Sequence, residues 1–217
     1  MTAPGTTRTH VPAWHRLLGL LRIAFALATL AAVIGQIVIS TGRPGFRVDN
    51  FFSFFTIESN VLNMVVMGAA GVLALSGRSA TRLAAWRGAA TLYMTITGIV
   101  YVTLLSGLEA SLQTATPWVN TILHYLMPVV ALVDFLVDRT VRPLGFVRPG
   151  LFWLIFPLLY LIYSEIRGPI IDWYPYPFLN PDNGIGGVVV ASLGIAVLAV
   201  VLTWLLCFST RARTPRP

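Results

Sequence analysis

Two polar side chains inside apolar, membrane-length segments have the types needed for ester chemistry. His124 lies in the segment 118–128, and Thr56 lies in the segment 54–60. An ionisable residue at membrane depth is costly and usually serves a function. If both segments are helical and start from the same side, a rise of about 1.5 Å per residue puts both side chains roughly 8–9 Å below one membrane face. A hydroxyl and an imidazole at one depth predict a nucleophile and its general base.

Other polar residues accompany this pair. Asn60 follows Thr56 at i+4, and Asn120 precedes His124 at i−4, so each shares a helix face with its neighbour. Either amide is a candidate donor to an oxyanion, and Asn120 is also a candidate for fixing the imidazole tautomer. Glu165, at the outer end of another segment, is a candidate for orienting His124. The candidates for lining the pocket are Glu58, Ser59, Asn63, Tyr101, Tyr125 and Tyr176.

Each of these residues also has a purely structural interpretation. Asn, Ser and Thr commonly hydrogen-bond across membrane helices, and a Thr hydroxyl often bonds the i−4 carbonyl of its own helix. The stripe Tyr93, Thr97 and Tyr101 is typical of core packing. Asp134 is interpreted as a structural partner of Arg139 or of another polar neighbour, with a proton relay as the alternative. 

Pro128 removes a backbone donor four residues after His124, which predicts a kink at that point.

Composition defines the class of protein. Of 217 residues, 56% are hydrophobic and 11% are charged, and the mean hydropathy is +0.78. A soluble domain carries about 25% charged residues, so we expect an integral membrane protein. Its 15 basic residues are all arginine and flank the apolar segments, as topology signals do, so the net charge of +7 does not indicate nucleic-acid binding. One cysteine, Cys207, excludes an intrachain disulfide and a Cys-rich metal site.

Six apolar segments are long enough to cross about 30 Å of hydrocarbon. We place them near residues 17–40, 52–76, 84–106, 118–137, 150–167 and 186–208. The first is too long for the apolar region of a typical signal peptide, so a retained span is expected. The predicted fold is therefore all-α, a polytopic bundle of six transmembrane helices over 17–208. A tail, 1–16, precedes it, and an Arg-rich tail, 209–217, follows.

The arginines also predict the orientation. Twelve of the fifteen lie on the side of the two termini, so the positive-inside rule places both termini in the cytoplasm, at a plasma or inner membrane. Thr56, His124 and Glu165 then lie near the opposite face. The loop 168–181, rich in aromatic residues and proline, is expected on that face as a lid or an interfacial belt.

Several short pieces carry a resemblance to a known family. They are Phe54-Phe55-Thr56, then Trp118-Val-Asn120 followed by His124 and Pro128, and Tyr176-Pro-Phe-Leu179 between the last two segments. In order and spacing the chain resembles the family of the androgen-induced-gene and androgen-dependent TFPI-regulating membrane proteins, and the six-span plan covers nearly the whole chain. The resemblance implies hydrolysis of fatty acid esters of hydroxy fatty acids, with Thr56 as nucleophile and His124 as catalytic histidine.

Three hypotheses follow. The first is an intramembrane lipid-ester hydrolase that needs no metal and no cofactor and takes a membrane lipid or acyl ester as substrate. The second is a membrane protein that binds or transports a small molecule or lipid without hydrolysis. The third is a structural membrane protein whose polar residues only hold helices together. No H-E-x-x-H, G-x-S-x-G or P-loop pattern is present.

Overall fold

The computed structural model describes residues 13–109, 116–138 and 143–212, and every regular element in these ranges is helical. Six helical spans are long and apolar enough to cross a membrane, as predicted. Their bounds are Ala13–Thr41 (α1), Phe55–Leu75 (α3), Thr81–Leu105 (η1, Thr81–Leu83; α4, Ala84–Val100; η2, Tyr101–Leu105), Pro117–Val137 (α5, Pro117–Asn120; η3, Thr121–Leu126; α6, Met127–Val137), Phe146–Ile171 (η4, Phe146–Gly150; α7, Leu151–Ile171) and Ile185–Ala212 (α8).

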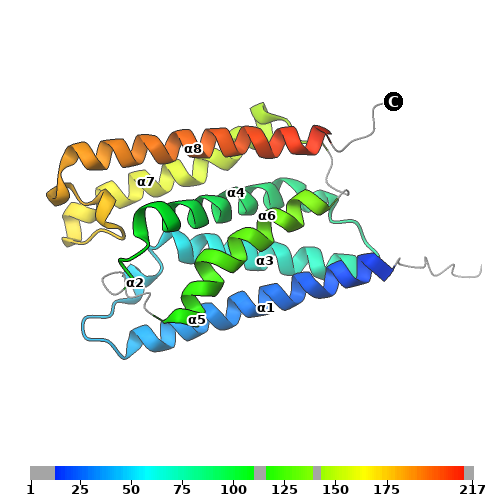
Figure 1. Ribbon diagram of the computed structural model, residues 1–217, viewed down its shortest axis with the longest axis horizontal. Helices are drawn as coiled ribbons and strands as arrows, with labels where there is room; N and C mark the ends of the chain where they lie inside the picture. The colour runs from blue at the N-terminus through cyan, green and yellow to red at the C-terminus, as the bar shows by residue number, and fades with distance from the viewer. Residues whose placement is uncertain (1–12, 110–115, 139–142, 213–217) are drawn as a thin grey trace, which may run out of the picture.

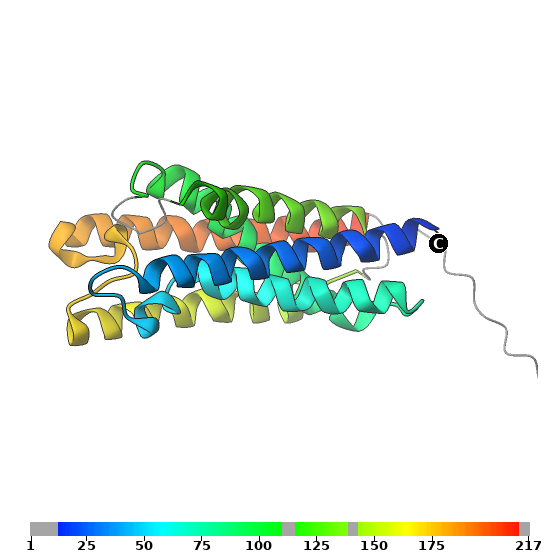
Figure 2. The same cartoon turned by 90° about the horizontal axis from the view of Figure 1, so that it is seen from below.

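The six spans form an elongated bundle (Figures 1 and 2). The start of α1 and the end of α8 lie together at one end, which we call the terminal end. The loop that joins α7 to α8 lies at the opposite end, which we call the site end. In Figure 1, α1 runs along one edge and α7 and α8 along the other. The span that contains α4 is the most buried, because α3, α6, α7 and α8 all contact this helix.

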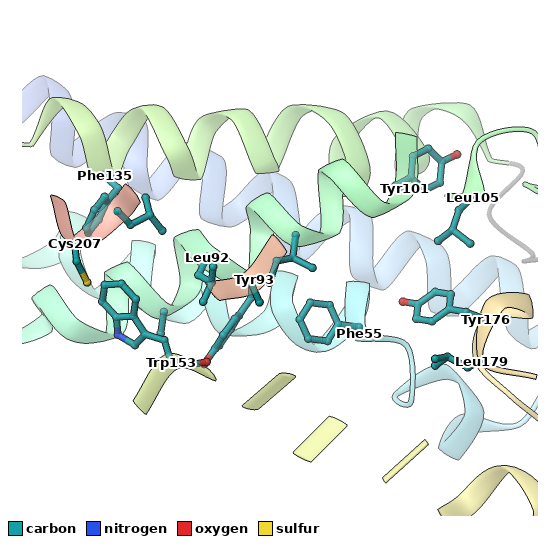
Figure 3. Close-up of a cluster of buried hydrophobic side chains, with 14 of the residues drawn as sticks. Phe55, Leu92, Tyr93, Tyr101, Leu105, Phe135, Trp153, Tyr176, Leu179 and Cys207 are labelled. Carbon is teal, nitrogen blue, oxygen red and sulfur yellow. The ribbon is translucent and has the colours of Figure 1, made fainter. Parts of the chain in front are cut away.

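Aromatic residues fill the layer between α4, α7 and α3. The ring of Trp153 on α7 covers Gly88 on α4, where a Cβ would lie only 2.1 Å from the indole. Tyr93 donates its hydroxyl hydrogen to the Trp153 carbonyl at 2.8 Å. Phe55 follows toward the site end, and Tyr176 and Leu179 close the row (Figure 3). This row of packed rings gives α3 a rigid support at the position where Thr56 is held.

Four buried charges hold the terminal end together. Arg22 of α1 contacts Asp134 at 2.7 Å and also bonds Asp138. Arg87 of α4 contacts Asp134 at 2.8 Å and Asp138 at 2.7 Å. Asp134 therefore does have a structural partner, but it is supplied by α1 and α4, and Arg139 lies outside the described residues. Each of the two arginines thus contacts both carboxylates, so opposite charges alternate around this cluster.

Three span boundaries differ from the prediction, and one of them, the start of the second span, affects the site. The second span begins at Phe55, because the short helix α2 (Val48–Phe51) and a turn occupy the residues before it. Thr56 is therefore in the first turn of its helix, not about five residues inside. The first and last spans extend to Ala13 and Ala212, so the helices include residues that the prediction assigned to the tails.

Candidate active site

Thr56 lies where α3 leaves four backbone N–H groups without helical partners. Its N–H donates to the hydroxyl oxygen of Tyr176 at 3.2 Å, and its Oγ1 lies 3.4 Å from the same hydroxyl. Burial raises the pKa of the Tyr176 phenol above its ordinary value, so this group remains protonated and able to donate. Tyr176 comes from the loop between α7 and α8, so this loop positions the Thr56 hydroxyl.

His124 lies in η3, a π-helical segment inserted between α5 and α6. Such segments widen a helix locally and are frequent at functional sites. The imidazole is buried, with 5% of its surface exposed, and stacks on the Tyr101 ring with centroids 4.0 Å apart. Its Nδ1 has no hydrogen-bond partner among the described residues. Packing alone does not explain a buried imidazole with an unused nitrogen.

Asn60 joins the two segments that carry Thr56 and His124. Its Nδ2 donates to the Thr56 carbonyl at 2.9 Å and to the carbonyl of Leu123, the residue before His124, at 3.2 Å. Both amide hydrogens have acceptors, so none remains for an oxyanion. These two bonds join the segments of Thr56 and His124, and Asn60 would have to give up one of them to donate to an oxyanion.

A hydrogen-bonded chain supports the other face of His124. Asn120 donates to the Tyr101 hydroxyl at 2.6 Å, and Tyr101 donates to Glu109 Oε1 at 3.0 Å. The backbone N–H of Gly107 also donates to this carboxylate and, as the largest cause, lowers the pKa of Glu109. Asn120 thus fixes Tyr101, which in turn stacks on His124.

A cavity of about 500 Å³ joins these groups at the site end. Thr56, His124, Asn120, Tyr101 and Tyr176 all line it. Among the described residues, no hydrogen bond links the Thr56 hydroxyl to the imidazole. Hydrogen bonds of catalytic groups are often long or missing without substrate, so a substrate in this cavity could contact both.

The loop between α7 and α8 forms one wall of this cavity. Its lining residues are Trp173, Tyr174, Pro175, Tyr176, Pro177, Asn180 and Asn183. At the mouth, Arg167 holds the loop near α2: it donates to Asp49 at 2.8 Å and lies 5.3 Å from the Trp173 ring centroid. Hydrogen bonding from Arg47 is the main cause that lowers the pKa of Asp49, which keeps this ion pair charged.

Six of the candidate residues are not in the lining of this cavity. They are Asn60, Glu58, Ser59, Asn63, Tyr125 and Glu165. Ser59 shares a hydrogen bond of 2.9 Å with Thr97 of α4, which fits the role of joining helices. Tyr125 meets the Tyr101 ring edge-on and is 43% exposed. Glu165 lies on α7, and no hydrogen bond or ion pair joins it to His124 among the described residues.

Sequence reasoning missed several groups of the site. Glu109 follows the third span and completes the chain from Asn120 through Tyr101. Gln36 and Ser40 of α1 line the same cavity and hydrogen-bond to each other at 3.2 Å. Their i, i+4 spacing in an apolar helix was a usable signal. The sequence contains no such signal for Glu109, because carboxylates are common just after the end of a membrane span.

Within the described parts of the chain, no cluster of three or more His, Cys, Asp or Glu side chains is arranged to hold a metal ion. The comparisons with known proteins found no match to the chain among family models, curated proteins or solved structures. The function must therefore be argued from the chemistry of the cavity.

Proposed function

We propose that this protein is a membrane-embedded hydrolase of lipid esters, with Thr56 as nucleophile and His124 as general base. The observation that carries the proposal is that both residues line one cavity while Asn60 joins the backbones of the two segments that carry them. A nucleophile needs a base within reach and a third group that fixes their geometry. The resemblance to the threonine hydrolase family points to the same pair and to esters of hydroxy fatty acids.

The reaction proceeds in two steps. The imidazole of His124 accepts the proton of the Thr56 hydroxyl as Oγ1 bonds to the ester carbonyl carbon, and it returns the proton to the alcohol oxygen as that C–O bond breaks. Water then attacks the acyl-threonine and gives one proton to the imidazole. The carboxylic acid is released, and the proton restores the threonine hydroxyl. No metal or cofactor takes part in this scheme.

The developing oxyanion needs a donor near Thr56 Oγ1. The Tyr176 hydroxyl, 3.4 Å from that atom, is the best-placed side chain. Asn120 is a second candidate, because its amide lines the cavity and one hydrogen bond to Tyr101 uses only one of its two hydrogens. Such a donor typically contributes about 2.7–4 kcal/mol to barrier lowering.

The membrane setting follows from the charges. The positive-inside rule puts the termini in the cytoplasm of a plasma or inner membrane. The site end would then face the opposite compartment, from which water can reach the cavity. Arg47, with 60% of its side chain exposed, is part of the cavity wall and makes that access direct.

A fluorophosphonate probe tests the proposal, since it labels activated hydroxyl nucleophiles. Detergent-solubilised wild type should be labelled, and Thr56→Ala and His124→Ala should not. Thr103→Ala is a matched control, because Thr103 is an exposed threonine near the same end that bonds only its own helix, at 2.8 Å to Ile99. Full labelling of Thr56→Ala would contradict the proposal, and loss of stability without loss of labelling would favour a structural role.

Binding or transport without hydrolysis is a second candidate function. It is favoured by a cavity that reaches the surface at the site end, while four buried charges join α1, α4 and α6 at the other end. A transporter holds one end closed in this way while its site is open to the other. Proton-driven uptake into proteoliposomes, with no ester turnover, would support this candidate.

A further inference from the structure

A second cavity, of about 280 Å³, lies directly beside Thr56 between α4, α7 and α8. Thr56, Leu105 and Tyr176 line both this cavity and the larger one. Thr56 is therefore at the junction of two spaces. The two spaces differ in chemistry, because His124, Asn120 and other polar groups line only the larger one.

The wall of the second cavity is almost entirely hydrocarbon. Its lining includes the apolar side chains of Ile96, Leu154, Ile195 and Ala199. The hydroxyls that reach it from α4 and α7 are already bonded: Tyr160 donates to the Ser53 carbonyl at 2.9 Å, and Thr97 shares its bond with Ser59. A bound molecule thus finds little to hydrogen-bond here, which selects an aliphatic chain.

This cavity reaches the lipid-facing side of the bundle. Leu158 on α7 and Val200 on α8 line it, and they are 57% and 44% exposed. The two helices run side by side at the edge of the bundle (Figure 1). A hydrocarbon chain could therefore enter from the bilayer between α7 and α8 without crossing water.

The length of the second cavity limits how much of an acyl chain it can hold. On α8 the lining runs from Ser192 to Val200, which corresponds to about 12 Å of helix rise. Phe178 and Leu179 close the end beside Thr56. A medium-length chain fills this length, and the rest of a longer chain would extend into the bilayer between α7 and α8.

Building on the proposed function, we infer that the cavity between α4, α7 and α8 binds the acyl chain of the ester, while the larger polar cavity receives its alcohol part. The ester carbonyl then lies at the junction, against Thr56. The acyl chain enters from the bilayer, and the alcohol leaves through the mouth at the site end. The second cavity thus determines which acyl chains are accepted.

A chain-length series tests this assignment by hydrolysis. Nitrophenyl butyrate, octanoate and palmitate are compared at equal detergent. Each buried methylene strengthens transition-state binding about fourfold, so wild type should favour octanoate over butyrate, and palmitate should gain little beyond octanoate because its outer methylenes lie outside the cavity. Ala196→Phe fills the cavity from α8 and should lower the octanoate-to-butyrate ratio at least tenfold. Val197→Phe, on the exposed face of the same helix, should keep the ratio. An unchanged ratio in Ala196→Phe would overturn the assignment.

Cross-linking tests the same site without requiring turnover. A diazirine-labelled medium-chain fatty acid should label peptides of α7 and α8 in wild type and equally in Thr56→Ala, and labelling should be lost in Ala196→Phe but not in Val197→Phe. Labelling of α7 and α8 without Thr56-dependent hydrolysis would refute the proposed hydrolase function but support the proposed acyl-chain site. Thr56-dependent hydrolysis with labelling elsewhere would refute the acyl site and keep the hydrolase.

Discussion

Replacing Arg87 by methionine should cause a large loss of stability at the terminal end. Arg87 is 4% exposed and bonds Asp134 and Asp138, which also bond Arg22. Methionine keeps most of the apolar volume but leaves two buried carboxylates facing one guanidinium. Breaking a buried ion pair on one side costs about 3–5 kcal/mol.

Thermal unfolding in detergent, followed by tryptophan fluorescence, measures the effect. For a chain of about 150–250 residues, 1 kcal/mol corresponds to about 2–4 °C in Tm, so Arg87→Met should lower Tm by roughly 6–20 °C. Arg78→Met is the control, because Arg78 is exposed after α3, and its effect should stay within about 0.5 kcal/mol. The double variant Arg87→Met/Asp134→Leu restores charge balance and should recover part of the loss. A Tm of Arg87→Met within 2 °C of wild type would refute this reasoning.

Three further changes have expected outcomes. Tyr176→Phe removes the hydroxyl next to Thr56 and should lower kcat by about 10²–10³-fold, the usual cost of losing an oxyanion donor; an unchanged kcat in steady-state ester assays would show that Tyr176 does not act there. Asn60→Leu removes the side-chain donor to the Leu123 carbonyl and one of the two side-chain donors to the Thr56 carbonyl, and it should cost about 1–3 kcal/mol of stability; kcat should fall further than in a variant of equal Tm that is altered away from the cavity. Gly88→Ala inserts a Cβ 2.1 Å from the Trp153 ring and should lower Tm by several degrees; a wild-type melting curve would show that α4 and α7 separate readily.

The spans could be predicted because hydropathy depends on local composition. Six apolar segments were enough to indicate six helices, and only their ends differed. The start of α3 moved to Phe55 because the residues before it form α2 and a turn, which a hydropathy window does not resolve.

The neighbours of each polar group could not be predicted, because helix rotation and packing order are long-range properties. Asp134 has its partner Arg22 at a sequence separation of 112 residues. The sequence identifies Asn60 and Asn120 as amides near Thr56 and His124. Only the packing shows that Asn60 hydrogen-bonds to backbone carbonyls and that Asn120 hydrogen-bonds to the Tyr101 hydroxyl. Glu165 has the right chemistry to orient an imidazole, but it is not in the lining of the cavity that holds His124.

The π-helical segments are a further feature that the sequence concealed. The kink expected at Pro128 stays a prediction, whereas the π-helical segment η3, from Thr121 to Leu126, contains His124 and ends before Pro128. A second such segment, η2, carries Tyr101 opposite the imidazole. Both are short departures from a regular helix, and both have the apolar composition of the spans around them.

The most direct test of the central claim is peptide mass spectrometry of wild-type protein treated with a fluorophosphonate. The account predicts one adduct, on the peptide that contains Thr56, with fragment ions that place it on this residue and with no adduct in His124→Ala. An adduct on another hydroxyl, such as Ser59, or ester hydrolysis that persists in Thr56→Ala, would contradict it.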